Sequence, residues 1–159
     1  MFKIGDTVLY PLHGAGVVQN IEEKEILGEV KSYYVLKIPI SDMTVMVPVD
    51  ADVGIRSIVD AETAKNVISK IGSLSLPPEA NWNQRFRDNM TRLKSGDMMV
   101  VASVVKSLLD RDLEKGLSTS ERKMLMSAKQ VLVSEAALAT GENPQDIEKE
   151  IYKSAGVSK

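Results

Sequence analysis

The spacing of apolar residues changes near Ile58, and this change most constrains what the chain can fold into. Before it, Val, Ile, Thr and Tyr gather in short segments separated by turn residues, a pattern typical of β-strands. After it, apolar residues recur every three to four positions, as on one face of an α-helix. Strands followed by helices predict an α+β protein with two domains.

Short strands fill the first 60 residues, with Pro, Gly and Asp between them. We expect strands at 7–10, 16–21, 33–40, 44–49 and 54–58. Five strands in so short a segment predict a small β-barrel of the Tudor or SH3 type. Regular strand spacing also suits an open antiparallel sheet, which remains the alternative.

The first helix is expected to begin after Asp60, whose side chain caps it, and to end at Gly72. Pro77 and Pro78 then stop any helix, because proline lacks an amide proton and keeps the residue before it out of the α region. We therefore predict three parts, listed from the N-terminus: a β-rich domain with its trailing helix at 1–72, a linker at 73–80 and an all-α domain at 81–159.

Four helices are expected in the second domain, at about 81–94, 97–115, 118–140 and 144–154. Ser118 and Glu121 form a capping box at the start of the third. Asn143 followed by Pro144 is a cap with proline at the first helical position, which predicts the start of the fourth.

Catalytic and membrane functions find little support in the composition. The chain of 159 residues has no cysteine and one histidine, His13, so thiolate or multi-histidine metal sites are excluded. It lacks a GxxxxGK[ST] motif, a membrane-spanning apolar run and an apolar signal segment. We expect a cytoplasmic protein that is not an enzyme and uses no cofactor or metal.

Charge is distributed unevenly although the whole chain has a net charge of only −2. Residues 1–78 carry 7 Lys/Arg against 10 Asp/Glu, residues 79–133 carry 10 against 7, and residues 134–159 carry 3 against 5. The middle segment is therefore positive, at +3, between two negative ones. A positive segment of this kind is compatible with weak binding to nucleic acid.

The positive segment begins with a helix that carries the only tryptophan, Trp82. At 100° per residue, Trp82 shares a narrow apolar stripe with Phe86, Met90 and Leu93, and basic residues flank the stripe on both sides. The ring either begins the core stripe or projects as a wedge toward exposed bases, with arginines holding the phosphates. The spacing does not choose between these two interpretations.

Motifs in both halves of the chain resemble the CarD and CdnL family of bacterial transcription regulators, in order and over nearly the whole chain. The segments that carry the resemblance are Phe2–Pro11, His13–Gly16, Tyr34–Lys37, Val47–Pro48, Asn81–Trp82, Leu93–Asp97, Gly116–Ser118 and Glu121–Leu125. The first domain also resembles the polymerase-interacting module of transcription-repair coupling factors.

The resemblance implies that a Tudor-like domain binds the β subunit of RNA polymerase and that the helical domain contacts promoter DNA at the upstream edge of the melted bubble. There a tryptophan enters the minor groove and slows bubble collapse, without reading sequence. The residues at the matching positions, with Lys123 added as a neighbour, are Trp82, Arg85, Arg87, Arg122 and Lys123.

The polymerase contact is expected at Lys24, Met46, Val47 and Pro48. Family members often have arginines at the positions of Lys24 and Met46. A guanidinium makes bidentate pairs with carboxylates that lysine and methionine do not, so the contact here is expected to be more apolar or to use another surface. A protein-binding adaptor that does not bind DNA is the alternative function.

Overall fold

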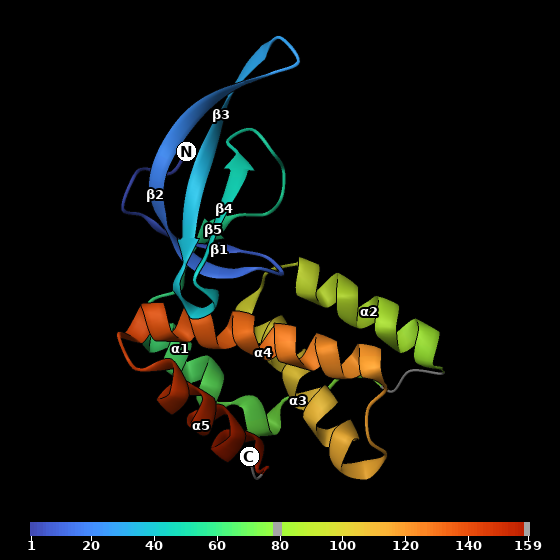
Figure 1. Ribbon diagram of the computed structural model, residues 1–159. Helices are drawn as coiled ribbons and strands as arrows, with labels where there is room; N and C mark the ends of the chain where they lie inside the picture. Colours follow the sequence, from blue (N-terminus) through green and yellow to red (C-terminus); the bar gives the residue numbers. More distant parts are fainter. Residues whose placement is uncertain (78–80, 158–159) are drawn as a thin grey trace.

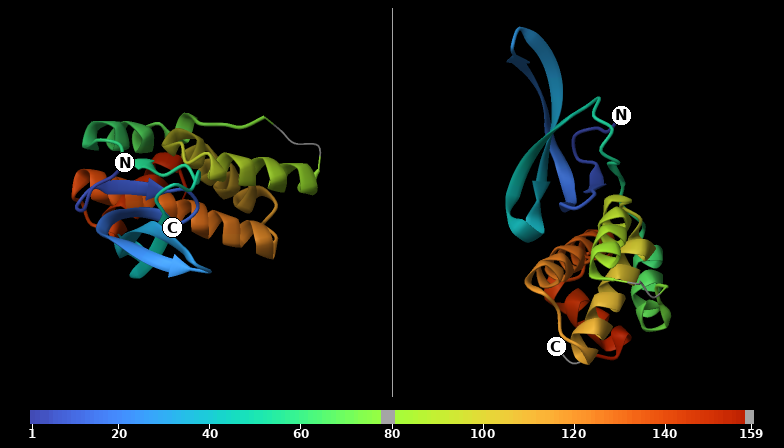
Figure 2. Two further views of the ribbon diagram at one scale, coloured as in Figure 1. Left: turned by 90° about the horizontal axis from the view of Figure 1, so that it is seen from above. Right: turned by 90° about the vertical axis from the view of Figure 1, so that its right-hand side faces the viewer.

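The computed structural model describes residues 1–77 and 81–157. A twisted sheet stands on a group of helices, and the long hairpin of the sheet projects away from them (Figures 1 and 2). The strands are β1 Thr7–Tyr10, β2 Gly14–Ile26, β3 Glu29–Ile38, β4 Met43–Pro48 and β5 Arg56–Ser57. The helices are α1 Ala61–Ser69, α2 Trp82–Lys94, α3 Met98–Glu114, α4 Thr119–Thr140 and α5 Pro144–Ala155, with 3₁₀ turns at Pro39–Ser41 and Ile71–Ser73.

The five predicted strands form one antiparallel sheet in the order β4-β3-β2-β1-β5. Within the described residues β4 and β5 do not pair, so the sheet is open, and the predicted closed barrel is corrected to the alternative. β5 is only two residues long, and it pairs with Val8 and Leu9 of β1. So short a strand offers too few backbone groups to close the sheet.

The hairpin of β2 and β3 is longer than the sequence predicted. The register pairs Glu22 with Tyr33 and continues to Ile26 opposite Glu29. The prediction ended the strand at residue 21 because the acidic residues that follow disfavour strands. Here both faces of the hairpin are exposed, so charged side chains remain in water while the backbone ladder continues.

Alternation along β3 separates the two faces of the sheet. Tyr34 and Leu36 face a small core, and Val35 between them faces the opposite side. The buried members of this core are Val8, Val18, Tyr34, Leu36 and Val47.

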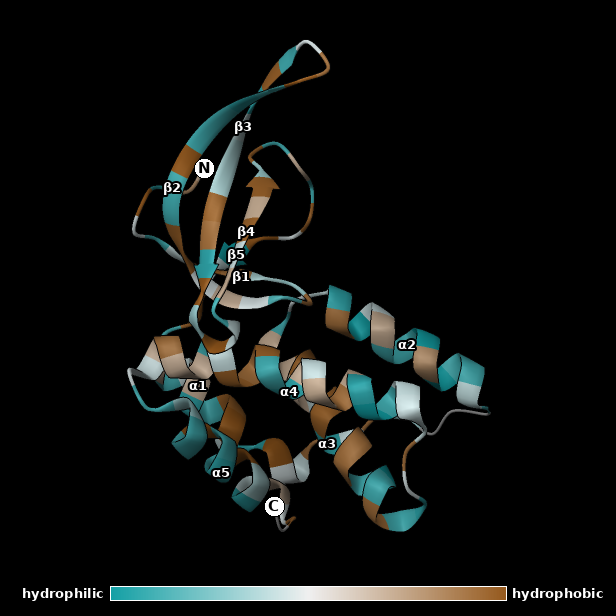
Figure 3. Cartoon of the chain, in the orientation of Figure 1, coloured by the Kyte–Doolittle hydropathy of each residue, from teal (hydrophilic) through white to brown (hydrophobic). Residues whose placement is uncertain are grey.

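Local signals place the helix starts as predicted. The side chains of Asp60, Asn81, Ser118 and Asn143 each accept a hydrogen bond from a backbone amide of the following helix. The four helices of the second domain begin and end within a few residues of the predicted bounds. Hydrophilic residues occupy much of α2 and α5, because the outer faces of these helices are exposed to solvent (Figure 3).

Helix α1 packs with the helices that follow it, although the sequence grouped it with residues 1–72. Its apolar residues Ala64, Val67 and Ile68 lie in the same core as α3, α4 and α5. This packing favours a domain boundary just before α1 over one in the predicted linker, of which residues 78–80 lie outside the described part.

The sheet and the helices meet over α4. A separate apolar cluster joins Leu9 and Ala15 of the sheet to Val131 of α4. The Ala15 amide donates to Ser134 Oγ at 2.9 Å. Gly14, with φ +123, comes so close to α4 that a Cβ would lie 3.1 Å from that hydroxyl. The glycine there allows β2 and α4 to pack closely.

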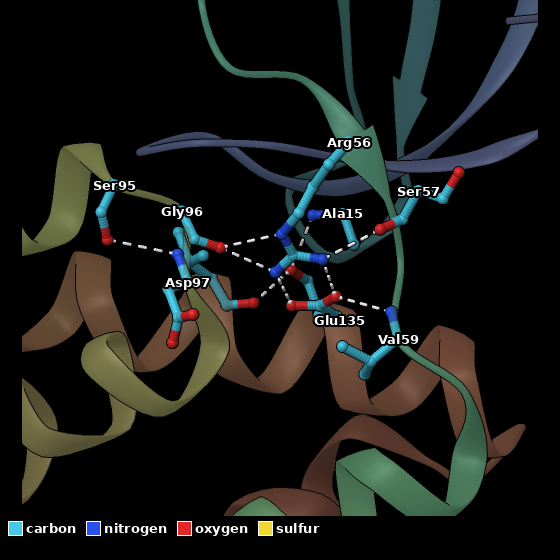
Figure 4. A network of polar contacts seen from close by, with 10 residues as sticks. Ala15, Arg56, Ser57, Val59, Ser95, Gly96, Asp97 and Glu135 are labelled. Carbon is cyan, nitrogen blue, oxygen red and sulfur yellow. Dashed lines mark hydrogen bonds and ion pairs between the residues drawn. The ribbon is translucent and has the colours of Figure 1, made fainter.

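A buried ion pair reinforces this junction, and we call it the Arg56–Glu135 clamp (Figure 4). Arg56 of β5 donates to both carboxylate oxygens of Glu135 on α4, at 2.6 and 2.8 Å. It also donates twice to the Gly96 carbonyl, and the Val59 amide donates to Glu135 at 3.0 Å. Because the Glu135 carboxylate is buried and fully paired, it fixes how the sheet sits on the helices.

Candidate functional site

Trp82 is the first residue of α2, directly after the Asn81 cap, and 40% of it is exposed. Its ring stacks on Phe86 one turn later, with centroids 5.0 Å apart and planes 18° apart. Phe86 in turn packs against the helical core. The ring is therefore supported by the core, as the first interpretation expects, and still presents a surface to solvent. Its contact with bases stays a prediction.

The indole N–H ties Trp82 to the start of α4. Nε1 donates to Glu121 Oε1 at 3.1 Å and to Ser118 Oγ at 3.3 Å. Both helices begin at the same end of the molecule (Figure 1). One edge of the ring is therefore anchored.

Arg85, which the resemblance placed on the DNA backbone, lies against the same carboxylate. Its Nε donates to Glu121 Oε2 at 2.8 Å and its Nη2 to Oε1 at 3.2 Å. Only 13% of the Arg85 side chain is exposed. The guanidinium is thus directed inward, toward α4.

Glu121 is a buried acid, with 2% of the residue exposed. Burial raises the pKa of its carboxyl, but hydrogen bonds and charge from Arg85, the charge of Arg111 and the bond from Trp82 outweigh it. The pKa therefore lies below its ordinary value. The nearest approach of Arg111 is 3.9 Å, an ion pair without a hydrogen bond. The carboxylate is charged at neutral pH and holds its neighbours in place.

Three other predicted DNA-contacting residues are exposed around the same end of the molecule. Arg87 lies on the outer face of α2, where its Nη2 contacts Gln84 Oε1 at 3.2 Å. Arg122 has 55% of its side chain exposed and lies 3.5 Å from Asp112. Lys123 is exposed beside a groove between α2 and α4 that Phe86 also lines. All three side chains are exposed to solvent, and their contact with DNA stays a prediction.

The predicted polymerase-binding residues lie on the sheet, but not all on one face. The register pairs Lys24 with Lys31, Met46 with Val35 and Pro48 with Tyr33. These partners alternate along β3, so Lys24, Met46 and Pro48 share the face opposite the sheet core.

Val47 lies on the other face, where it is 1% exposed within the sheet core. Its side chain packs in that core and is not available to a partner. Met46 is 37% exposed, and β4 is an edge strand. The outward face and the free edge of β4 thus form one accessible surface.

Sequence reasoning missed the buried acids. Glu121 was assigned to a capping box and Glu135 to a helix interior, and neither spacing signals a pairing with Arg85 or Arg56. Within residues 1–77 and 81–157, no group of three or more His, Asp or Glu side chains is placed to hold a metal ion. No helix in that part is long and apolar enough to cross a membrane.

Comparisons with known proteins match both halves of the chain. The family model described as the CarD-like/TRCF RID domain matches residues 2–59, and the model described as the CarD C-terminal domain matches residues 66–152. A protein of Bacillus subtilis (strain 168) named "Putative transcription factor YdeB" is 38% identical over 143 residues, covering 89% of this chain and 94% of that protein. The gap between the two family models falls just before and within α1.

Proposed function

The chain belongs to the CarD family, and from this premise we propose that it regulates transcription by binding two partners at once. The sheet binds the β subunit of RNA polymerase. The start of α2 and α4 contacts promoter DNA at the upstream edge of the melted bubble and stabilises the open complex. The half-exposed Trp82, anchored among exposed cations, is the observation that carries the proposal.

The sheet supports the polymerase contact through β4. An edge strand presents unpaired backbone groups, and a strand of another protein can pair with them and so extend the sheet. Met46 adds an exposed apolar contact on the same strand, and Lys24 adds a cation on the same face. The family model that matches this region, shared with TRCF proteins, agrees with a polymerase-binding role.

The helices support the DNA contact with two kinds of side chain, an aromatic ring and several cations. The exposed part of the Trp82 ring enters the minor groove or stacks on an unpaired base, while Arg87, Arg122 and Lys123 bind phosphates. A few phosphate contacts bind non-specific DNA weakly, with a Kd of about 10⁻⁴ to 10⁻⁶ M. Such contacts alone would rarely occupy a promoter.

Anchoring on polymerase overcomes this weakness. Once the sheet is bound, the DNA contact is intramolecular, at an effective concentration of roughly millimolar. The Arg56–Glu135 clamp joins the sheet to α4, the helix whose Glu121 bonds to Trp82, and so limits movement between the two contacts. Stabilising the open complex by about 1.4 kcal/mol changes its lifetime roughly tenfold, which is within reach of one stacked aromatic ring.

The test compares wild type with Trp82→Ala on a promoter that responds to the protein. Polymerase binding should stay unchanged, because Trp82 lies on the helices, while open complexes should collapse up to about tenfold faster. Equal lifetimes would contradict the wedge. Footprinting tests the rival function, because an adaptor that does not bind DNA would add no protection to the footprint of polymerase alone.

A further inference from the structure

We propose that Glu121 is a positioning residue that sets the orientation in which Trp82 meets DNA, and that Arg85 acts through this carboxylate rather than on a phosphate. The inference rests on the proposed function of Trp82. It differs from that function in assigning two further residues to an internal support.

Three contacts define the pose of the indole ring: stacking on Phe86 and hydrogen bonds from Nε1 to Glu121 and to Ser118. Stacking on Phe86 fixes the plane of the ring, with 18° between the two planes. Stacking alone leaves the ring free to flip by about 180° about its Cβ–Cγ bond, because that half-turn keeps the ring plane and exchanges its two edges. The bond from Nε1 to Glu121 at 3.1 Å removes this freedom. The same edge of the ring is then always the one left exposed.

Glu121 is itself held rigidly. Its carboxylate accepts two hydrogen bonds from Arg85, and the backbone amide of Glu121 donates to Ser118 Oγ at 3.2 Å. A second cation, Arg111, lies 3.9 Å away. The carboxylate keeps its place because leaving Arg85 would break both of its charge-assisted hydrogen bonds while the charge stays buried.

Arg85 is poorly placed to bind a phosphate. Its side chain is 13% exposed, and reaching DNA would require breaking two charge-assisted hydrogen bonds to a buried acid. Arg87, two residues away, is exposed, and its guanidinium contacts Gln84 at 3.2 Å. The phosphate role therefore suits Arg87, and Arg85 orders the ring from behind.

The first experiment observes the ring in the free protein. Because Trp82 is the only tryptophan, the indole N–H resonance and acrylamide quenching report on this one side chain. Glu121→Ala should shift the resonance and increase quenching, and Glu121→Gln, which keeps an acceptor, should have a smaller effect. Glu142→Gln, which changes an exposed acid beyond the end of α4, is the matched control. Circular dichroism checks that each variant is folded.

The second experiment measures open-complex lifetime. Glu121→Ala should shorten it roughly threefold to tenfold, and adding Arg85→Ala should shorten it little further because both act on one ring. Arg87→Ala should lower the slope of log lifetime against log salt by about 1, and Arg85→Ala should not.

The outcomes separate the two claims. If Trp82→Ala leaves the lifetime unchanged, the proposed function fails and this inference with it. If Trp82→Ala shortens the lifetime but folded Glu121→Ala changes neither the resonance nor the lifetime, only the positioning role is overturned. Additive effects of Arg85→Ala and Glu121→Ala, with a lower salt slope for Arg85→Ala, would return Arg85 to the phosphates.

Discussion

Replacing Arg56 with alanine should destabilise the protein by about 3 kcal/mol. Removing one partner of a buried ion pair costs about 3–5 kcal/mol because the other charge stays buried and unpaired. Glu135 is 1% exposed, but 30% of the Arg56 side chain reaches water, so we take the lower end of that range. Glu135 also keeps the amide of Val59 as a donor, which limits the loss.

Urea denaturation followed by circular dichroism measures this change. For a chain of this size, about 3 kcal/mol also corresponds to a fall of roughly 6–12 °C in Tm. Arg56→Lys should lie between wild type and Arg56→Ala, because lysine keeps the charge but not the fork that reaches both Glu135 and the Gly96 carbonyl.

Lys31→Ala is the matched control, since Lys31 and Glu29 form an exposed ion pair at 3.8 Å. That variant should change stability by about 0.5 kcal/mol or less. If Arg56→Ala proved as mild as the control, the clamp would be an ordinary surface pair. The clamp would then not be what fixes the sheet on the helices.

Two smaller predictions concern Glu121 and the hairpin tip. The pKa of Glu121 is lowered in the folded state by Arg85, Arg111 and Trp82, so its stabilisation is present at neutral pH and is lost as pH falls through that lowered value. The stability difference between wild type and Glu121→Gln should therefore shrink in acid, as measured by urea denaturation at several pH values. Leu27 is fully exposed with φ +53, in a two-residue turn with Gly28 at φ +81. Asparagine tolerates that conformation better, so Leu27→Asn should raise the free energy of unfolding by about 0.5 kcal/mol, seen as a higher urea midpoint. A lower midpoint would show that the Leu27 side chain packs against the protein in solution.

The helices could be predicted from the sequence because their signals are local. Caps such as Asp60 and Ser118 lie within three residues of the amides they satisfy, and the apolar spacing repeats within each helix. Most strands were predicted for the same reason. The predicted closure of the sheet was wrong, because closure depends on whether distant strands pair.

The supporting contacts of the site could not be predicted. Arg56 and Glu135 are 79 residues apart in sequence, and Arg85 and Glu121 are 36 apart. In the sequence, nothing distinguishes these acidic and basic residues from charged residues that remain exposed to solvent. Trp82 was found because it is the only tryptophan and lies on a basic helix, whereas the inward direction of Arg85 depends on how α2 rotates against α4.

The most direct test is a structure of the protein bound to RNA polymerase and a melted promoter. We expect β4 to lie against the β subunit and the Trp82 ring to lie against DNA at the upstream edge of the bubble, still bonded to Glu121. Trp82 turned into its own helices, with no nucleic acid within contact distance, would contradict it.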